Sequence, residues 1–161
     1  MMKTPSLLRA IRLLAALALA PLAGGCSDQG PDDELLRHVE TARSRWNAVR
    51  LDRYTYDLLR ICECTPELAG PVSVSVQGAD PIAWAYVDGS AVPASIRPSF
   101  PSVDGLFDLI EDAIRQGAWE VTAMYDGETG VPIEFRIDYE QFVFDEEAYY
   151  RVVAMPQAPG A

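Results

Sequence analysis

The chain has 161 residues, of which 24 are acidic and 13 basic, so its formal net charge is −11 at neutral pH. Such a chain is repelled by nucleic acid and by anionic lipid surfaces, and we expect neither as a partner. The length fits one domain with a real hydrophobic core.

The first 26 residues have the pattern of an export signal that ends in a lipidated cysteine. Lys3, Arg9 and Arg12 make a positive start, residues 13–22 form an apolar run, and small residues precede Cys26. The run is too short to cross a bilayer, which takes about 20 residues. A plain secretory signal or a membrane helix is the alternative, although nothing apolar follows the cysteine to lengthen a span.

This segment resembles the signals of bacterial lipoproteins, in which the cysteine is diacylated and becomes the first residue after cleavage. The resemblance implies that residues 1–25 are a cleaved signal peptide, that residues 26–31 are a lipidated tether, and that Cys26 anchors the protein to the membrane of the cell envelope. Ser27 stands where an aspartate would resemble the inner-membrane retention signal, so the implied location is the outer membrane, facing the periplasm. Cleavage would leave ten basic and 24 acidic residues, a net charge of −14.

The first predicted element of the domain is a helix over residues 33–50. Its apolar side chains recur at intervals of three and four, and acidic residues stand at its start, where the helix dipole favours them. These apolar positions are Leu35, Val39, Ala42, Trp46 and Val49.

Three strands are predicted next, over residues 54–64, 72–77 and 82–86. Apolar and polar side chains alternate along them, which is typical of strands with one buried face. Cys62 and Cys64 fall at the end of the first strand with the same parity, so we expect both sulfur atoms on one face. The three strands should form an antiparallel meander.

A long connection over residues 88–101 leads to a second predicted helix. Ser102 is a suitable N-cap for this helix, and Gly117 ends it. The remaining strands are predicted over residues 119–125, 131–139 and 149–154. Residues 156–161 are expected to form a flexible tail.

The element order αβββαβββ predicts a single α+β domain over residues 32–155. Each strand has one apolar and one polar side, so we expect an antiparallel sheet of about six strands with both helices packed on one face. The repeated order allows two similar halves, at 35–87 and 103–153, and fits an ordinary α+β domain equally well. The three tryptophans fall at predicted core-facing positions, namely Trp46, Trp84 and Trp119.

The first candidate for chemistry is the pair Cys62 and Cys64. We expect a structural disulfide, because lipidation would use the thiol of Cys26 and leave an even number of free cysteines in an oxidising compartment. Reduced buried thiols, a redox-active pair, and a soft-metal site for Cu(I) or Zn remain open. The only histidine, His38, lies far away in the sequence, and we expect no metal and no cofactor.

The second candidate is the acidic segment from Asp138 to Glu147. Clustered carboxylates can hold Ca²⁺, but the central glycine of the EF-hand is missing, so a solvated loop is the simpler interpretation. Phe142 and Phe144 lie between the acids and either enter the core or, if exposed, form a partner-binding ridge.

Enzyme activity is not expected from this sequence. No motif places a nucleophile beside the single histidine, and no glycine-rich phosphate loop is present. Hydrolysis by paired carboxylates stays open, because sequence does not give their separation.

Several short motifs spread over the domain resemble an uncharacterised family of small bacterial lipoproteins, domain of unknown function 6174. The residues that carry this resemblance are Trp46, Tyr54-Thr55-Tyr56, Cys62-x-Cys64, the strand Val72 to Gly78, Phe107, Tyr125-Asp126, Gly130-x-Pro132, Ile137-Asp138 and Asp145-Glu146-Glu147. The family has no assigned activity, so the resemblance implies a shared fold and no catalytic residue.

Our leading hypothesis is a lipid-anchored envelope protein that acts as a non-catalytic binding or scaffolding module, with an envelope protein as its partner. The candidate surface is the sheet face opposite the helices, with Asp57, Glu134, Arg136 and Asp138 as its main charged residues. The alternative is a thiol-redox or soft-metal-handling lipoprotein that acts through Cys62 and Cys64.

Overall fold

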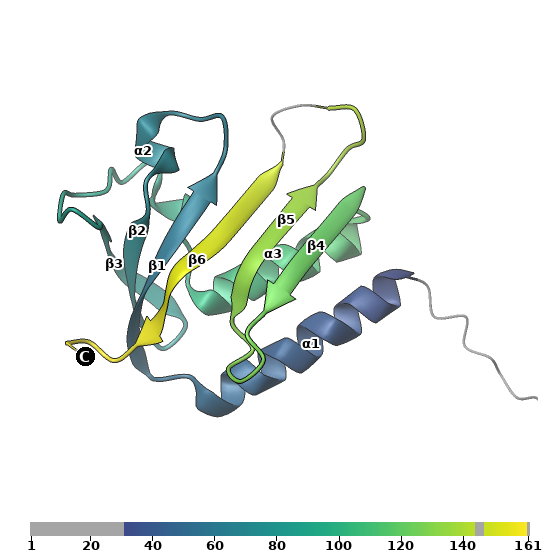
Figure 1. Ribbon diagram of the computed structural model, residues 1–161, viewed down its shortest axis with the longest axis horizontal. Helices are drawn as coiled ribbons and strands as arrows, with labels where there is room; N and C mark the ends of the chain where they lie inside the picture. Colours follow the sequence, from purple (N-terminus) through teal and green to yellow (C-terminus); the bar gives the residue numbers. More distant parts are fainter. Residues whose placement is uncertain (1–30, 144–146, 161) are drawn as a thin grey trace, which may run out of the picture.

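Residues 31–143 and 147–160 are described by a computed structural model, in which two helices cover one face of a six-stranded sheet (Figure 1). The helices are α1 (Pro31–Val49) and α3 (Val103–Gln116), with a short α2 (Pro66–Ala69) and a 3₁₀ turn at Arg97–Ser99. The strands are β1 (Arg53–Ile61), β2 (Val72–Gln77), β3 (Asp80–Tyr86), β4 (Glu120–Tyr125), β5 (Pro132–Asp138) and β6 (Ala148–Gln157). The predicted α+β class and its element order are confirmed. In the described part of the chain, no helix is long and apolar enough to cross a membrane.

The sheet is antiparallel throughout, with the strand order β3-β2-β1-β6-β5-β4. Each half is a helix followed by a three-stranded meander, as the repeated order suggested. The two meanders meet differently, however, because the first strand of one half pairs with the last strand of the other. A two-fold axis through the sheet would instead pair β1 with β4, so the halves are not related by that symmetry.

The helix α3 has well-defined ends. The Ser102 hydroxyl oxygen accepts a hydrogen bond from the Gly105 amide at 3.2 Å, which caps the first turn. Gly117 ends the helix in the left-handed conformation at φ 72°. Between these ends, one apolar stripe packs on the sheet, formed by Val103, Leu106, Phe107, Ile110, Ala113 and Ile114, all buried.

The core lies between the two helices and the inward-facing side chains of the strands. From the sheet it takes buried aromatic and β-branched side chains, among them Tyr54, Tyr56, Val72, Val74, Phe135 and Ile137. From α1 it takes Val39, Ala42 and Trp46, which are 2% exposed. The observed burial therefore matches the period-2 and period-3.6 patterns of the sequence, except at Val49, which ends α1 and is 50% exposed.

The long connection before α3 is fixed to the sheet by side-chain hydrogen bonds. The Tyr56 hydroxyl donates to the Pro101 carbonyl, and the Tyr54 hydroxyl oxygen accepts from the Val103 amide at 3.2 Å. The Trp84 indole N–H donates to the Phe100 carbonyl at 2.8 Å. These bonds satisfy buried polar groups and set the start of α3 over β1.

The turn between β4 and β5 packs tightly on α1. Gly130 has φ +78°, and a Cβ atom at this position would lie 2.1 Å from the Ala42 carbonyl oxygen. Only glycine combines this backbone conformation with so close an approach to a neighbouring helix.

Three details differ from the expectations. β1 ends at Ile61, so Cys62 and Cys64 lie in a bend after the strand and not within it. Trp119 is 57% exposed and directly precedes the edge strand β4, so its predicted core position was wrong. β6 continues through Gln157, which pairs with Thr55.

Candidate functional site

The open face of the sheet carries the residues that the sequence singled out as a binding surface. Glu134, Arg136 and Asp138 alternate along β5 with buried side chains and therefore share the face away from the helices. Asp57 lies on the same face of β1, where it accepts a hydrogen bond from the Ser73 hydroxyl. These four side chains therefore lie on one face of the sheet, and binding at this face stays a prediction.

Glu134 is the centre of a hydrogen-bonded cluster on this face. Its carboxylate accepts from the Tyr149 hydroxyl at 2.6 Å and from Arg151 Nε at 2.7 Å, and Arg151 also donates to the Tyr149 hydroxyl at 3.0 Å. The hydrogen bonds from Arg151 and Tyr149 lower the pKa of Glu134 below its usual range. The carboxylate therefore stays ionised at neutral pH, which suits an ion-pair partner and not a general acid.

Neighbouring charges on β5 are held in different ways. Arg136 donates to Glu147 at 2.8 Å. Asp138 lies opposite Glu120 of β4, and its Oδ1 is buried with no hydrogen-bond partner among the described residues. Two like charges face each other here, which is unfavourable for the strand pair.

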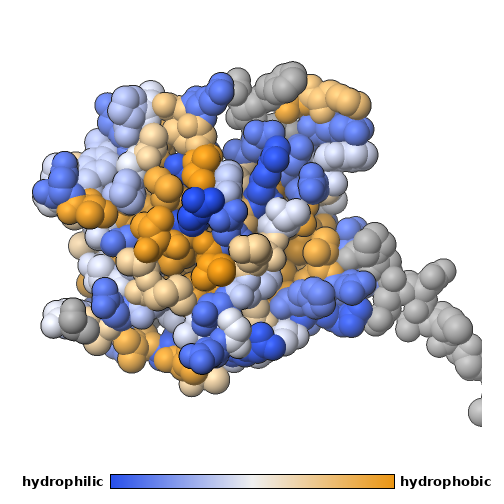
Figure 2. Space-filling model, in the orientation of Figure 1, coloured by the Kyte–Doolittle hydropathy of each residue, from blue (hydrophilic) through white to orange (hydrophobic). Residues whose placement is uncertain are grey.

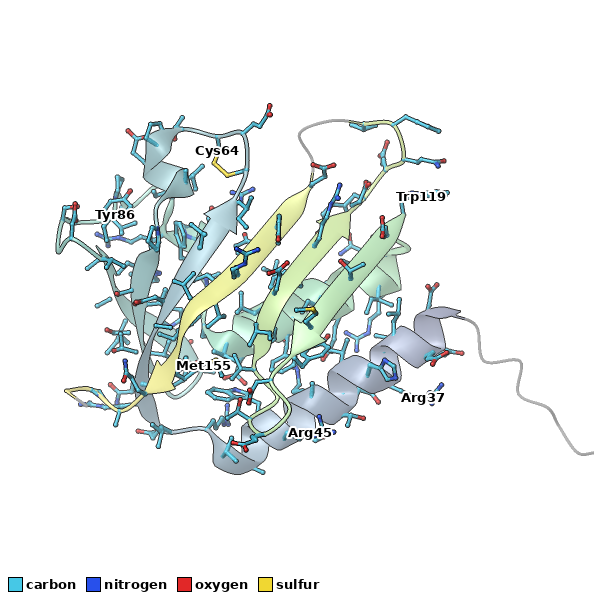
Figure 3. The ribbon with its side chains drawn as sticks, in the orientation of Figure 1. Arg37, Arg45, Cys64, Tyr86, Trp119 and Met155 are labelled. Atoms are coloured by element: carbon cyan, nitrogen blue, oxygen red, sulfur yellow. A yellow bond between two sulfur atoms is a disulfide. The ribbon has the colours of Figure 1, made fainter. Side chains whose placement is uncertain are left out.

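An apolar strip runs down the middle of the open face, where Figure 2 shows hydrophobic side chains gathered over the central strands. We call this the central strip; it consists of Leu59 and Ile61 of β1 with Val153 and Met155 of β6. Val153 is 49% and Met155 38% exposed, although β6 lies at the centre of the sheet. Figure 3 shows the side chains around Met155 and along the strands of this face. The polar residues of this face were predicted from the sequence. The strip was not, because the side chains on the exposed side of β6 are themselves apolar.

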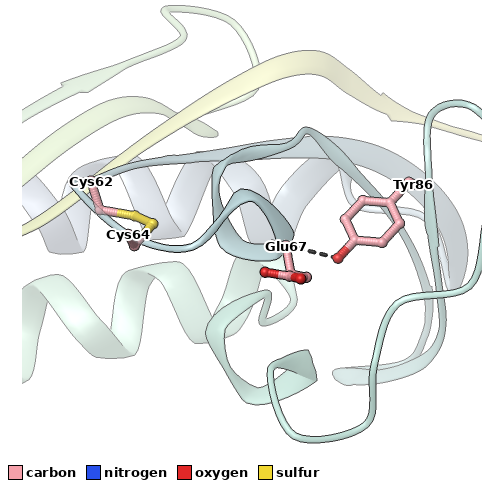
Figure 4. Close-up of a disulfide and its surroundings, with 4 residues drawn as sticks. All are labelled: Cys62, Cys64, Glu67 and Tyr86. Carbon is pink, nitrogen blue, oxygen red and sulfur yellow. Dashed lines mark hydrogen bonds between the residues drawn. A yellow bond between two sulfur atoms is a disulfide. The ribbon is translucent and has the colours of Figure 1, made fainter.

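Cys62 and Cys64 are joined by a disulfide, with their Cα atoms 5.2 Å apart (Figure 4). It lies between the end of β1 and α2, whose Glu67 carbonyl accepts a hydrogen bond from the Tyr86 hydroxyl at 2.8 Å. The expected pairing of these two cysteines is therefore present.

The disulfide borders a cleft with a volume of about 760 Å³. Arg60 and Arg136 line it together with Tyr149. Arg60 lies over the Tyr150 ring at 5.9 Å, and its Nε is buried without a hydrogen-bond partner among the described residues. Glu63 and Glu147 line the same cleft, and Arg136 is paired with Glu147.

His38 lies in a different place, at a groove of about 280 Å³ between α1, α3 and β4. Apolar side chains such as Leu35 and Val121 line most of this groove. The Tyr125 hydroxyl is buried at its wall without a hydrogen-bond partner within residues 31–143 and 147–160, and burial raises the pKa of this group above its usual value. The histidine and the cysteines therefore do not form one site.

The other predicted residues have mixed outcomes. Cys26 lies outside the described residues, as do Phe144, Asp145 and Glu146 of the acidic segment. Phe142 does not enter the core and is 86% exposed. Among residues 31–143 and 147–160, no three His, Cys, Asp or Glu side chains are grouped closely enough to hold a metal ion.

The comparisons with known proteins bear on the family of the chain and not on its activity. Neither the curated proteins nor the solved structures include a significant match. One family model matches residues 38–156, a range that includes the Cys62–Cys64 bend and all of the sheet except Gln157 at the end of β6. The chain therefore belongs to DUF6174, a family of unknown function.

Proposed function

We propose that this protein is a lipid-anchored component of a bacterial cell envelope, whose domain binds another envelope protein through the open face of its sheet without catalysis. The observation that carries the proposal is the central strip, an apolar surface on the two middle strands of a sheet whose other face carries the core.

The surroundings of the strip match the anatomy of a protein interface. Such interfaces have an apolar centre and a polar rim. Here Val153 and Met155 supply the centre, and the cluster of Glu134, Tyr149 and Arg151 lies beside it. These charged groups already bond to one another, so covering them removes less hydration than covering free charges would.

Site-specific cross-linking in the intact chain tests the surface. A photoreactive residue replacing Val153 should form one cross-linked product in envelopes, whereas the same residue replacing Val49, which is 50% exposed on α1, should not. Met155→Asp should abolish the product, because a buried unpaired charge opposes association. A product that forms equally from position 49, or that survives Met155→Asp, would refute the proposed surface.

The anchor is tested separately through Cys26. Replacing it with serine removes the thiol that lipid attachment needs, so Cys26→Ser should stall processing or release the domain from membranes. Unchanged partition of this variant with the membrane fraction would contradict the anchor while leaving the sheet surface open to its own test.

A second function, thiol exchange or soft-metal handling, is favoured by one observation: the disulfide borders a cleft of about 760 Å³. Intact mass after mild reduction and alkylation measures how readily Cys62 and Cys64 open. Rapid labelling or copper binding would support chemistry at this bend, and resistance to mild reductant would support a structural bond.

A further inference from the structure

Exposed aromatic side chains gather at one end of the molecule. Trp119, between α3 and β4, is 57% exposed, and Phe142, in the loop after β5, is 86% exposed with Val143 beside it at 44%. The two segments are joined, since the Trp119 amide donates to the Tyr139 carbonyl at 3.3 Å. Figure 3 shows Trp119 at the outer edge of the sheet, beside the start of β4. Exposed apolar side chains that lie together in neighbouring segments are typical of interaction surfaces.

The start of α1 lies at the same end. Leu35, in the second turn of the helix, lines one groove together with Ile114 and Val121, which flank the segment that carries Trp119. Figure 1 shows the first turn of α1, the start of β4 and the loop after β5 along one side of the molecule. We call this side, defined by the α1 start, Trp119 and Phe142–Val143, the anchor end.

The chain before α1 limits what can cover this end. Cys26 precedes Pro31 by five residues, and a fully extended chain spans at most about 3.5 Å per residue, so the tether reaches about 17 Å. A lipid on Cys26 would therefore hold the anchor end close to the bilayer, while the opposite sheet edge, β3, would point away.

We propose that the anchor end rests on the bilayer, with Trp119 and Phe142 inserted at the interface of zwitterionic phospholipid. The proposal rests on the lipidation of Cys26, which is part of the function proposed above. Tryptophan is enriched at membrane interfaces because its ring is apolar and its N–H is polar. Such a contact would fix the orientation of the domain relative to the bilayer.

The charges at this end determine the kind of lipid. Asp32, Asp33 and Glu34 are exposed in the first turn of α1, and Glu120 is exposed next to Trp119. Anionic headgroups would be repelled by these carboxylates, so neutral headgroups are the better fit. Because β4 is the edge nearest the membrane, the open sheet face with its central strip stays accessible to a partner.

Fluorescence quenching by brominated lipid tests the contact in the processed, lipidated protein. Three tryptophans report: Trp46 is buried, Trp84 is half-buried and donates to the Phe100 carbonyl, and only Trp119 is exposed. In phosphatidylcholine vesicles with brominated chains, we expect clear quenching of the wild type and loss of most of it in Trp119→Phe. Phe142→Ser should weaken it, whereas Ile82→Ser, an exposed position on β3, should not.

The outcomes separate this proposal from the anchor itself. Intact mass of the same preparation reports lipidation of Cys26; an unlipidated cysteine would overturn the anchor and this proposal together. Lipidated protein with equal quenching in wild type and Trp119→Phe would overturn the membrane contact alone. Stronger quenching by phosphatidylglycerol than by phosphatidylcholine would also refute it. If Trp119 is not quenched by the lipid in vesicles but is covered in native envelopes, the membrane contact is refuted and the anchor end binds a protein partner instead.

Discussion

Gly130 offers the sharpest test of how the sheet and α1 are packed. In Gly130→Ala the new Cβ would lie 2.1 Å from the Ala42 carbonyl oxygen, and Ala42 is itself buried in the core. The turn cannot move away easily, because the Asp126 carboxylate accepts from the Thr129 amide and hydroxyl at 2.7 Å each. The left-handed conformation costs alanine about 1–2 kcal/mol, and overpacking adds about 1–3 kcal/mol. We expect a total loss of about 2–5 kcal/mol in the free energy of unfolding.

Gly117→Ala is the matched control. Gly117 has φ +72°, close to that of Gly130, but a Cβ there would meet no atom within 4 Å. Only the conformational cost of about 1–2 kcal/mol should remain. Urea unfolding of the two variants, made in the chain without its lipid, measures the difference. Equal destabilisation by both substitutions would refute the close packing of the turn on α1.

Three further predictions concern stability. Ser102→Ala removes the N-cap of α3 and should lower the free energy of unfolding by about 1 kcal/mol in urea melts; an unchanged midpoint would contradict the capping role. The double substitution Cys62→Ser and Cys64→Ser opens a three-residue ring, and loop entropy predicts a loss of about 1–2 kcal/mol in the free energy of unfolding. A far larger loss in thermal melts would contradict this reasoning and show that the disulfide also stabilises the structure around it. Glu134 has a lowered pKa in the folded state, so its stabilising contribution is present above its unfolded pKa and is lost as the pH falls through the folded pKa. The stability gap between wild type and Glu134→Gln should therefore shrink when urea melts are repeated at acidic pH, and a gap that widens would disprove the ion pair.

The sequence was sufficient for the elements and for their buried faces. Val72, Val74 and Val76 alternate with polar residues and are all buried on β2. Ser102 and Gly117 bound α3 as expected, because capping chemistry is local.

What the sequence could not provide is non-local. Alternation tells which side of a strand is buried and not which strand lies next to it, so the central pairing of β1 with β6 had no signal. The prediction for Trp119 was wrong because the alternation of apolar and polar residues in β4 was extended back to a position before the strand begins, where the side chain is exposed. The short helix α2 has only four residues, too few for any periodicity.

The central pairing of β1 with β6 has a consequence for how the chain reaches its native state. Ile61 pairs with Tyr149, 88 positions later, so the middle of the sheet closes only when the last strand is present. Contacts this distant in sequence form slowly, because closing so long a loop costs conformational entropy before the contact is gained. A chain that emerges N-terminus first, from a ribosome or through a membrane as in the export proposed above, therefore closes the middle of its sheet only when its C-terminal strand is available.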